Sequence, residues 1–221
     1  MFHTSGRPAE PPRDCPLCPR LVAFRAEWRA KEPGWHNAPV DTLHPQEGKD
    51  GVALLVVGLA PGVRGANRTG RPFTGDYAGD LLYRTLHAHG FANDRFAADP
   101  DDGLTLFGTA ITNSVRCVPP QNKPVGAEIN TCRQFLAATL DGLPNLRAIV
   151  TLGRIAHDST VRTLGLRLAD HGFRHGARVP AGPYTLFPTY HCSRYNTNTG
   201  RLTEPMFDAV FADVASFLGR A

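Results

Sequence analysis

Lysine is scarce in this chain of 221 residues, because 21 of the 24 basic residues are arginines. Few positions therefore supply the amine nucleophile that a covalent Schiff-base mechanism needs. Planar arginine forks suit phosphates and the base edges of nucleic acids. A GC-rich genome that prefers arginine codons explains the same composition, so composition alone does not establish a nucleic-acid partner.

Long apolar runs are absent as well. No segment approaches the roughly 18 apolar residues that a membrane span needs. The first residues, MFHTSGRPAEPPRD, lack the basic and apolar regions of a secretory signal. We therefore expect a cytoplasmic protein, and a monomer. Structural disulfides are rare in a reducing compartment, so five cysteines indicate a metal or redox role.

Internal repeats, low-complexity tracts and two common nucleotide-binding motifs are also missing. Neither G-x-G-x-x-G nor G-K-[ST] follows the first apolar run, VALLVVGLAPG, which argues against a dinucleotide or P-loop site. An apolar content of 42% and a charged content of 20% are typical of a folded globular protein. We expect a flexible polar leader over residues 1–14 and a single domain over residues 15–221.

Four apolar runs predict buried strands, within VALLVVGLAPG and at residues 106–112, 147–153 and 184–191. Helical spacing predicts a first helix with Leu17 and Trp28 on its apolar side, a middle helix with Cys132 on its inward stripe, and a terminal helix near Phe207. Strands that alternate with helices predict a parallel sheet covered on both faces. The segment 162–182 is expected to be an extended loop.

Four cysteines form a candidate metal site. Cys15 and Cys18 form C-P-L-C, a spacing that lets both sulfurs face one ion or cluster, and Cys117 and Cys132 lie far downstream. Four thiolates suit a tetrahedral zinc ion or a cluster of four irons and four sulfurs. Zinc sites usually pair two closely spaced knuckles, which favours the cluster, whereas ordinary buried thiols are the alternative for the two downstream cysteines.

Three polar loops follow the expected strands. The first, GLAPGVRGANRTGRPFTGDYAGDLL, is rich in glycine and leads into a helix, which suits a phosphate. The second, TNSVRCVPPQNKP, and the third, TYHCSRYNTNTG, are polar and follow later strands. Because such loops leave the carboxyl ends of parallel strands, one cleft is expected to collect Phe73, Asp76, Asn122 and His191. Taken singly, each also has an ordinary explanation as a core, cap, turn or surface residue.

These motifs together resemble the family 5, or type B, uracil-DNA glycosylases. The resemblance rests on C-P-L-C, GLAPG with RPFTGD, C-V-P-P-Q-N-K-P and H-C-S, which occur in the family's order between residues 15 and 202. It implies a three-layer α/β/α sandwich with a central four-stranded parallel sheet and a structural four-iron, four-sulfur cluster. The implied cluster ligands are Cys15, Cys18, Cys117 and Cys132.

The resemblance also implies removal of uracil from double- or single-stranded DNA, which leaves an abasic site. Uracil in a duplex must first be flipped into the pocket. There Phe73 would stack on the ring, and the amide of Asn122 would read the O4 and N3 edge. His191 matches the histidine that donates a hydrogen bond to uracil O2 as negative charge grows on the departing base.

One position departs from related enzymes. Family 4 relatives carry a glutamate where this chain has Leu59, so the usual water-orienting carboxylate is missing. Asp76 is the best substitute, to hold water or to stabilise the cationic sugar, with help from backbone carbonyls near Gly58 and Ala60. The missing polar group is expected to widen the substrate range to hypoxanthine and other deaminated bases. Since only Lys123 lies near the expected site, we expect a monofunctional glycosylase with no lyase step.

Four residues are expected to contact DNA: Arg64 in the first loop, and Arg194, Tyr195 and Asn196 in the third, with Tyr195 as a wedge into the base stack. Two other interpretations stay open at this point. A non-catalytic iron–sulfur or zinc module would bind nucleic acid without releasing a base, and the assembled polar side chains argue against it. A ferredoxin-like electron carrier would need only the cysteines, and the size of the domain argues against that.

Overall fold

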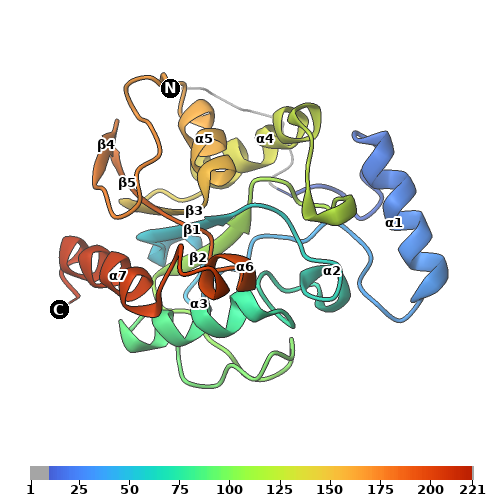
Figure 1. Ribbon diagram of the computed structural model, residues 1–221, viewed down its shortest axis with the longest axis horizontal. Helices are drawn as coiled ribbons and strands as arrows, with labels where there is room; N and C mark the ends of the chain where they lie inside the picture. The colour runs from blue at the N-terminus through green and yellow to red at the C-terminus, as the bar shows by residue number, and fades with distance from the viewer. Residues whose placement is uncertain (1–9, 221) are drawn as a thin grey trace.

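A five-stranded sheet forms the centre of the computed structural model, which describes residues 10–220 (Figure 1). Four strands run parallel in the order β2-β1-β3-β5. They are β1 (Leu54–Gly58), β2 (Thr109–Asn113), β3 (Ala148–Leu152) and β5 (Tyr184–Thr189). The expected four parallel strands are confirmed, and each lies within its predicted run or ends one residue beyond it.

A fifth strand was not expected. β4 (Val179–Ala181) pairs antiparallel with β5 at the edge of the sheet, inside the segment that was predicted to be a loop. Pro180 lies in the middle of β4, and an edge strand tolerates proline because one side of its backbone needs no partner. Three residues with a central proline give no period that a sequence pattern can detect.

Helices cover both faces of the sheet, as Figure 1 shows. In β1, Leu54 and Val56 pack on one side with α3 (Tyr77–Ala88) and α7 (Glu204–Leu218). Leu55 and Val57 pack on the other side with α4 (Gly126–Asp141) and α5 (Arg154–Thr163). Successive side chains of a strand point to opposite faces, so a strand covered on both sides must be apolar throughout. The predicted α/β/α sandwich is therefore confirmed.

The remaining helices surround the ends of the strands. They are α1 (Pro19–Lys31), α2 (Ala66–Thr69) and α6 (Arg194–Asn198), with the 3-10 turns η1 (Lys49–Gly51) and η2 (Pro120–Asn122). α1 begins at Pro19, whose fixed φ suits the first helical position. The prediction for Leu17 was wrong, because this side chain precedes α1 and is 45% exposed.

Residues 1–9 of the expected leader lie outside the described residues. In its described part, Glu10 accepts a hydrogen bond from Arg116 Nη1 at 2.6 Å and another from the Thr42 N–H at 3.2 Å. Residues near position 10 therefore already contact the domain. Within residues 10–220, no helix is long and apolar enough to cross a membrane.

Candidate functional site

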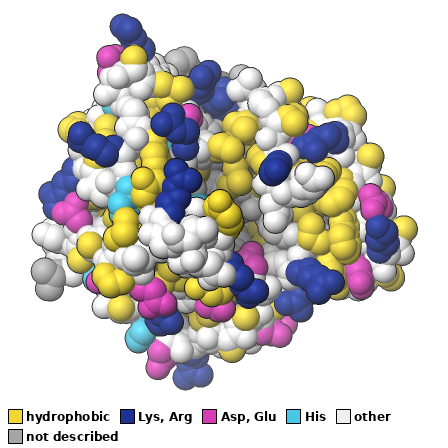
Figure 2. Space-filling model, viewed as in Figure 1, with side chains coloured by type: hydrophobic (Ala, Val, Ile, Leu, Met, Phe, Trp, Pro, Cys, Tyr) yellow, Lys and Arg dark blue, Asp and Glu magenta, His cyan; other side chains and the backbone are white. Residues whose placement is uncertain are grey.

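A cavity of about 560 Å³ opens at the carboxyl ends of the parallel strands. Its walls come from the segments that follow β1, β2, β3 and β5, represented by Leu59, Asn113, Gly153 and His191. Figure 2 shows a hollow near the middle of this face, with arginine and lysine side chains on several sides. The four residues expected to share one cleft, Phe73, Asp76, Asn122 and His191, all line the cavity, and so does Ala60.

Phe73 forms an aromatic wall of the cavity. It is 7% exposed, and its ring centroid lies 6.1 Å from that of His191. Its φ of 52° lies in the left-handed region, which a bulky side chain adopts only when the surroundings enforce it. Gly58 is buried behind this ring, since a Cβ there would lie 2.6 Å from Phe73 Cζ and 2.3 Å from Asn113 Oδ1. Gly58 thus makes room for the wall but does not line the cavity.

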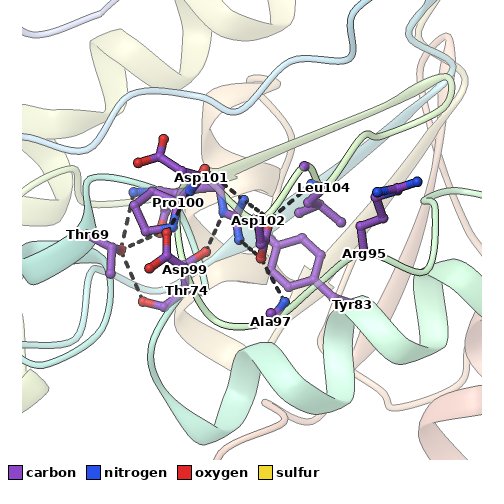
Figure 3. Close-up of polar contacts among 12 residues, drawn as sticks. Thr69, Thr74, Tyr83, Arg95, Ala97, Asp99, Pro100, Asp101, Asp102 and Leu104 are labelled. Atoms are coloured by element: carbon purple, nitrogen blue, oxygen red, sulfur yellow. Dashed lines mark hydrogen bonds and ion pairs between the residues drawn. The ribbon is translucent and has the colours of Figure 1, made fainter.

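A buried ion pair holds the turn that carries Phe73, and Figure 3 shows its surroundings. Two nitrogens of Arg71 donate to the two carboxylate oxygens of Asp102 at 2.7 Å each, and the side chains are 9% and 2% exposed. Arg71 Nε also donates to Thr74 Oγ1 at 2.7 Å, and the hydroxyl of Tyr83 donates to the Pro72 carbonyl at 2.6 Å. These bonds fix the backbone on both sides of Phe73.

We expect Asp102→Asn to lower the free energy of unfolding at pH 7 by about 2–3 kcal/mol, because it leaves the buried Arg71 charge unpaired. The hydrogen bonds from Arg71 hold the pKa of the Asp102 carboxyl well below its usual range. A carboxyl group whose pKa is lowered in the folded state stabilises the fold at neutral pH. This stabilisation is lost as pH falls below about 4. Urea unfolding from pH 7 to pH 3 measures both effects. Asp208→Asn, which removes an exposed partner of His89, is the matched control and should change stability by less than about 0.5 kcal/mol.

Asp76 lies where the glycine loop meets α3. Its Oδ1 accepts a hydrogen bond from the Gly79 N–H at 3.2 Å, so the residue caps the helix. Its Oδ2 faces Gly65, where a Cβ would lie 2.4 Å away. Burial raises the pKa of the Asp76 carboxyl, opposed by hydrogen bonds from the Gly79 and Ala78 backbone. Asp76 therefore serves as a cap and also places the one carboxylate among the described residues that line the cavity.

Two asparagines line the cavity, and only one was predicted. Asn122 ends η2 with a φ of 55°, and its side chain is exposed at the rim. Asn113, the last residue of β2, is 3% exposed, and its Oδ1 is buried without a hydrogen-bond partner among the described residues. A buried, unpaired amide oxygen is unfavourable unless a ligand satisfies it. The sequence signal was available, because Asn113 directly follows the strand predicted at residues 106–112, at the edge where the other site residues were expected.

His191 follows β5 and is held by its own loop. Burial lowers the pKa of His191 to about 4, so its imidazole is neutral at pH 7 and donates one N–H. The amide of Asn196 donates to the His191 carbonyl at 2.9 Å. The buried Cys192 thiol donates to the Ala78 carbonyl at 3.4 Å, and burial raises its pKa. This cysteine packs as an inert thiol and leaves the imidazole of His191 to the cavity.

The four residues predicted to contact DNA lie in different surroundings. Arg194 lines the cavity, with its guanidinium 5.2 Å from the Tyr77 ring centroid. Tyr195 is 72% exposed beside it. Asn196 is partly buried and uses its amide inside the loop. Arg64 is exposed but lines a second pocket instead of this cavity.

The four candidate metal ligands lie together in one apolar cluster with Leu21, Val115 and Phe135, and none forms a disulfide. Within residues 10–220, no three His, Cys, Asp or Glu side chains are arranged to hold a single metal ion. A single zinc ion needs all its sulfurs at about 2.3 Å. A four-iron cluster binds each thiolate through a different iron, so its four sulfurs do not have to meet at one ion.

Hydrogen-bond donors point at two of these sulfurs. Nη1 of the buried Arg25 lies 3.5 Å from Cys117 Sγ, and the Arg116 N–H lies 3.3 Å from Cys132 Sγ. Burial raises the pKa of the Cys117 thiol to about 12 and that of Cys132 to about 11. Thiolates at such buried positions need positive charge and hydrogen-bond donors to compensate, and bound iron together with these two donors would supply both. The residues present therefore fit an iron–sulfur cluster.

Comparison with known proteins gives a consistent family. The model of the uracil DNA glycosylase superfamily matches residues 45–215, a range that contains every residue lining the cavity. A type-5 uracil-DNA glycosylase of Thermus thermophilus is 44% identical over 93% of this chain and 94% of that protein. Those of Mycobacterium leprae and Pyrobaculum aerophilum are 42% and 35% identical, each over 93% of this chain and over 92% and 90% of their own lengths.

Proposed function

This chain belongs to the uracil DNA glycosylase superfamily, and we propose that its cavity hydrolyses the N-glycosidic bond of uracil in DNA with the residues described above. Uracil excision itself follows from the family match and from the identity to type-5 relatives. The observation that carries the assignment of residues is the cavity, which combines an aromatic wall, a neutral imidazole and one carboxylate. Individual roles are proposals, argued below from burial and charge.

Base recognition is assigned first. Uracil enters as a flipped nucleotide and stacks on Phe73, the wall that the ion pair of Arg71 holds in place. An amide reads the O4 and N3 edge because it offers both a donor and an acceptor. Asn122 was predicted for this role, but the buried and unpaired amide of Asn113 is better suited, since a hydrogen bond discriminates most where water is excluded. We therefore assign the reading to Asn113 and contact at the rim to Asn122.

Bond cleavage leaves negative charge on the base and positive charge on the sugar. Neutral His191 donates its N–H to the base oxygen as that charge develops, and no proton has to be removed first. Asp76 accepts a hydrogen bond from the attacking water or stabilises the cationic sugar. Leu59 lines the cavity as an apolar residue and leaves that task to Asp76. Without a polar group at this position, the cavity is also expected to accept hypoxanthine and other deaminated bases.

DNA is the substrate of this family, and the finer details are proposals. Double- and single-stranded substrates are both expected, with Arg194 and Arg64 on phosphates and Tyr195 as a wedge. No lysine lines the cavity within the described residues, which supports hydrolysis without a lyase step. We further propose a single catalytic domain over residues 15–221 that acts as a monomer in the cytoplasm. Cysteines free of disulfides are compatible with that compartment.

The cysteine cluster is proposed to hold a four-iron, four-sulfur group. Its ligands would be Cys15, Cys18, Cys117 and Cys132, with Arg25 donating to one of the sulfurs. When bound, this group joins the start of α1 to the β2–α4 region, so its contribution is structural. None of the four cysteines lines the cavity, and all of them line a separate, smaller pocket.

Purified protein is expected to carry about four irons and four sulfides per chain. Iron and sulfide analysis, together with a broad visible absorption band, checks this. Cys132→Ser should lose most of the iron and lower the Tm, whereas Cys192→Ser, a matched change outside the cluster, should keep the full iron content. One zinc per chain in place of iron would contradict the assignment.

A cleavage assay tests the whole proposal. Oligonucleotides with one uracil, one hypoxanthine or one thymine mismatch are incubated with the protein and then treated with alkali to reveal abasic sites. We expect release of uracil, slower release of hypoxanthine, and no strand nicking before alkali. Nicking of abasic DNA with trapping by borohydride would contradict the hydrolytic, monofunctional mechanism. No release of any base would overturn the enzymatic function.

A further inference from the structure

A second pocket, of about 520 Å³, lies between α1 and the glycine loop. Two tryptophans, Trp28 from α1 and Trp35 from the segment after it, form one wall, with their rings stacked at a centroid distance of 5.3 Å. Glu32 also lines the pocket. Both tryptophan side chains are partly exposed. Partly exposed, stacked aromatic rings beside a cavity form a surface on which another flat ring can stack.

The opposite wall is basic. Arg64 and Arg68 are both exposed, and neither takes part in an ion pair in the described part of the chain. Arg68 Nε donates to the Arg64 carbonyl at 3.0 Å, which orders its guanidinium. Lys31 lies 5.5 Å from the Trp28 ring centroid, but its charge is paired with that of Glu27. The pocket therefore presents two unpaired guanidinium groups opposite aromatic rings.

The second pocket and the catalytic cavity border the same loop, because Gly75 lines the pocket and the next residue, Asp76, lines the cavity. Gly75 has a φ of 88°, and a Cβ there would lie 2.5 Å from Arg68 Nη2, so only glycine lets the guanidinium approach this closely. A strand whose flipped nucleotide occupies the cavity therefore lies against the loop that also borders the second pocket.

We propose that this pocket binds a nucleotide of the substrate strand that flanks the flipped uracil. Its base stacks on the tryptophan wall, and its phosphate lies between Arg64 and Arg68. An aromatic ring with unpaired arginines is the combination that binds single-stranded nucleic acid without regard to sequence. The inference rests on the proposed glycosylase function. It adds a subsite that binds the substrate strand next to the flipped nucleotide.

The test measures uracil release from short single-stranded oligonucleotides that carry one uracil and zero to four thymidines on either its 5′ or its 3′ side. In the wild type, extension on one side should lower KM on the order of tenfold, as stacking of one base predicts. Trp35→Leu and Arg68→Gln should each remove most of this gain and leave KM for the unextended substrate and kcat for all substrates unchanged. Arg84→Gln, which removes an exposed arginine paired with Glu204 on the α3 side, is the matched control and should keep the full gain.

Tryptophan fluorescence gives a second measurement, because the chain has only these two tryptophans. An extended oligonucleotide with an abasic analogue in place of the uracil nucleotide should quench it, and an unextended one should not. The subsite is overturned if extension lowers KM equally in the wild type, Trp35→Leu and Arg68→Gln, or lowers it in none of them. Either result leaves the proposed function intact as long as the wild type releases uracil. Failure of the wild type to release uracil from every substrate contradicts the proposed function instead.

Discussion

Replacing Asn113 by alanine is expected to lower kcat/KM for uracil release by about a hundred- to a thousandfold, the effect of removing one buried polar contact to the reacting group. Asn113 is 3% exposed, and its Oδ1 has no partner among the described residues. Because the Asn113 oxygen has no bond to water to give up, a hydrogen bond from uracil to this oxygen contributes its full free energy to binding. The folded protein should tolerate the change, because the alanine removes an unsatisfied group.

The measurement is single-turnover release from one oligonucleotide, compared with Asn122→Ala as the matched control. Asn122 is exposed at the rim, and its replacement should reduce the rate by about tenfold or less, since exposed hydrogen bonds compete with water. A second substrate with cytosine in place of uracil checks discrimination, which Asn113→Asp should relax. The reverse order, with Asn122→Ala far more damaging than Asn113→Ala, would restore the base-reading role to Asn122.

The layered fold could be predicted because its strands are buried on both faces. Continuous apolar runs such as that of β1, separated by helical patterns, leave little choice but a covered parallel sheet. β4 could not be predicted, because three residues around Pro180 carry no periodic signal and pair only through β5. Leu17 was misassigned for a related reason. Helical spacing alone does not locate a helix start, which here depends on Pro19.

Much of the site could also be predicted from the rule that ligands bind at the carboxyl ends of parallel strands. That rule and the motifs placed Asp76 and His191 correctly in the cavity. They named Asn122 and did not point to Asn113, because the burial of Asn113 is decided by packing against Gly58 and Phe73, which no local pattern shows. They also predicted a DNA contact for Asn196, and the structure adds that its amide donates a hydrogen bond to the His191 carbonyl, five residues earlier in the chain. Such a bond depends on how the loop folds, which residue spacing alone does not give.

The tryptophan pocket could not be predicted from the sequence either. Trp28 has helical spacing with other apolar residues of α1 and was interpreted as part of its apolar side. Its partner Trp35 lies beyond the helix, and the arginines of the opposite wall come from a loop about 30 residues later. Sequence spacing cannot bring these three segments together. A pocket of this kind becomes visible only in the folded chain.

Asp76 caps α3 and is the carboxylate of the proposed mechanism, and Asp76→Asn should separate these two roles. Asparagine is as good a helix cap as aspartate, so the capping bond to Gly79 is kept. The charge is lost, and with it the attraction for the developing sugar cation or the acceptor for water. We expect kcat to fall by about a hundred- to a thousandfold at pH 7, with KM changed little.

The same substitution is expected to raise the Tm at pH 7 by roughly 1–3 °C. Burial raises the pKa of the Asp76 carboxyl in the folded protein, so the fold binds its proton more tightly than the unfolded chain does. The stability contributed in this way is present below about pH 4 and is lost as pH rises through the folded pKa. The gain from asparagine should therefore appear at pH 7 and vanish near pH 3.5. A lower Tm at pH 7 would show that the charge stabilises the fold.

The pH dependence of the rate gives the second half of this test. In the wild type, kcat should fall as pH falls through the raised pKa of Asp76, because the protonated carboxyl no longer carries the charge. Residual release by Asp76→Asn should stay flat until about pH 4, where His191 becomes protonated. Glu204→Gln, which removes an exposed carboxylate that pairs with Arg84, should keep the wild-type profile. If Asp76→Asn keeps the same fall in rate at low pH as the wild type, another group causes that fall and Asp76 does not act in the catalytic step.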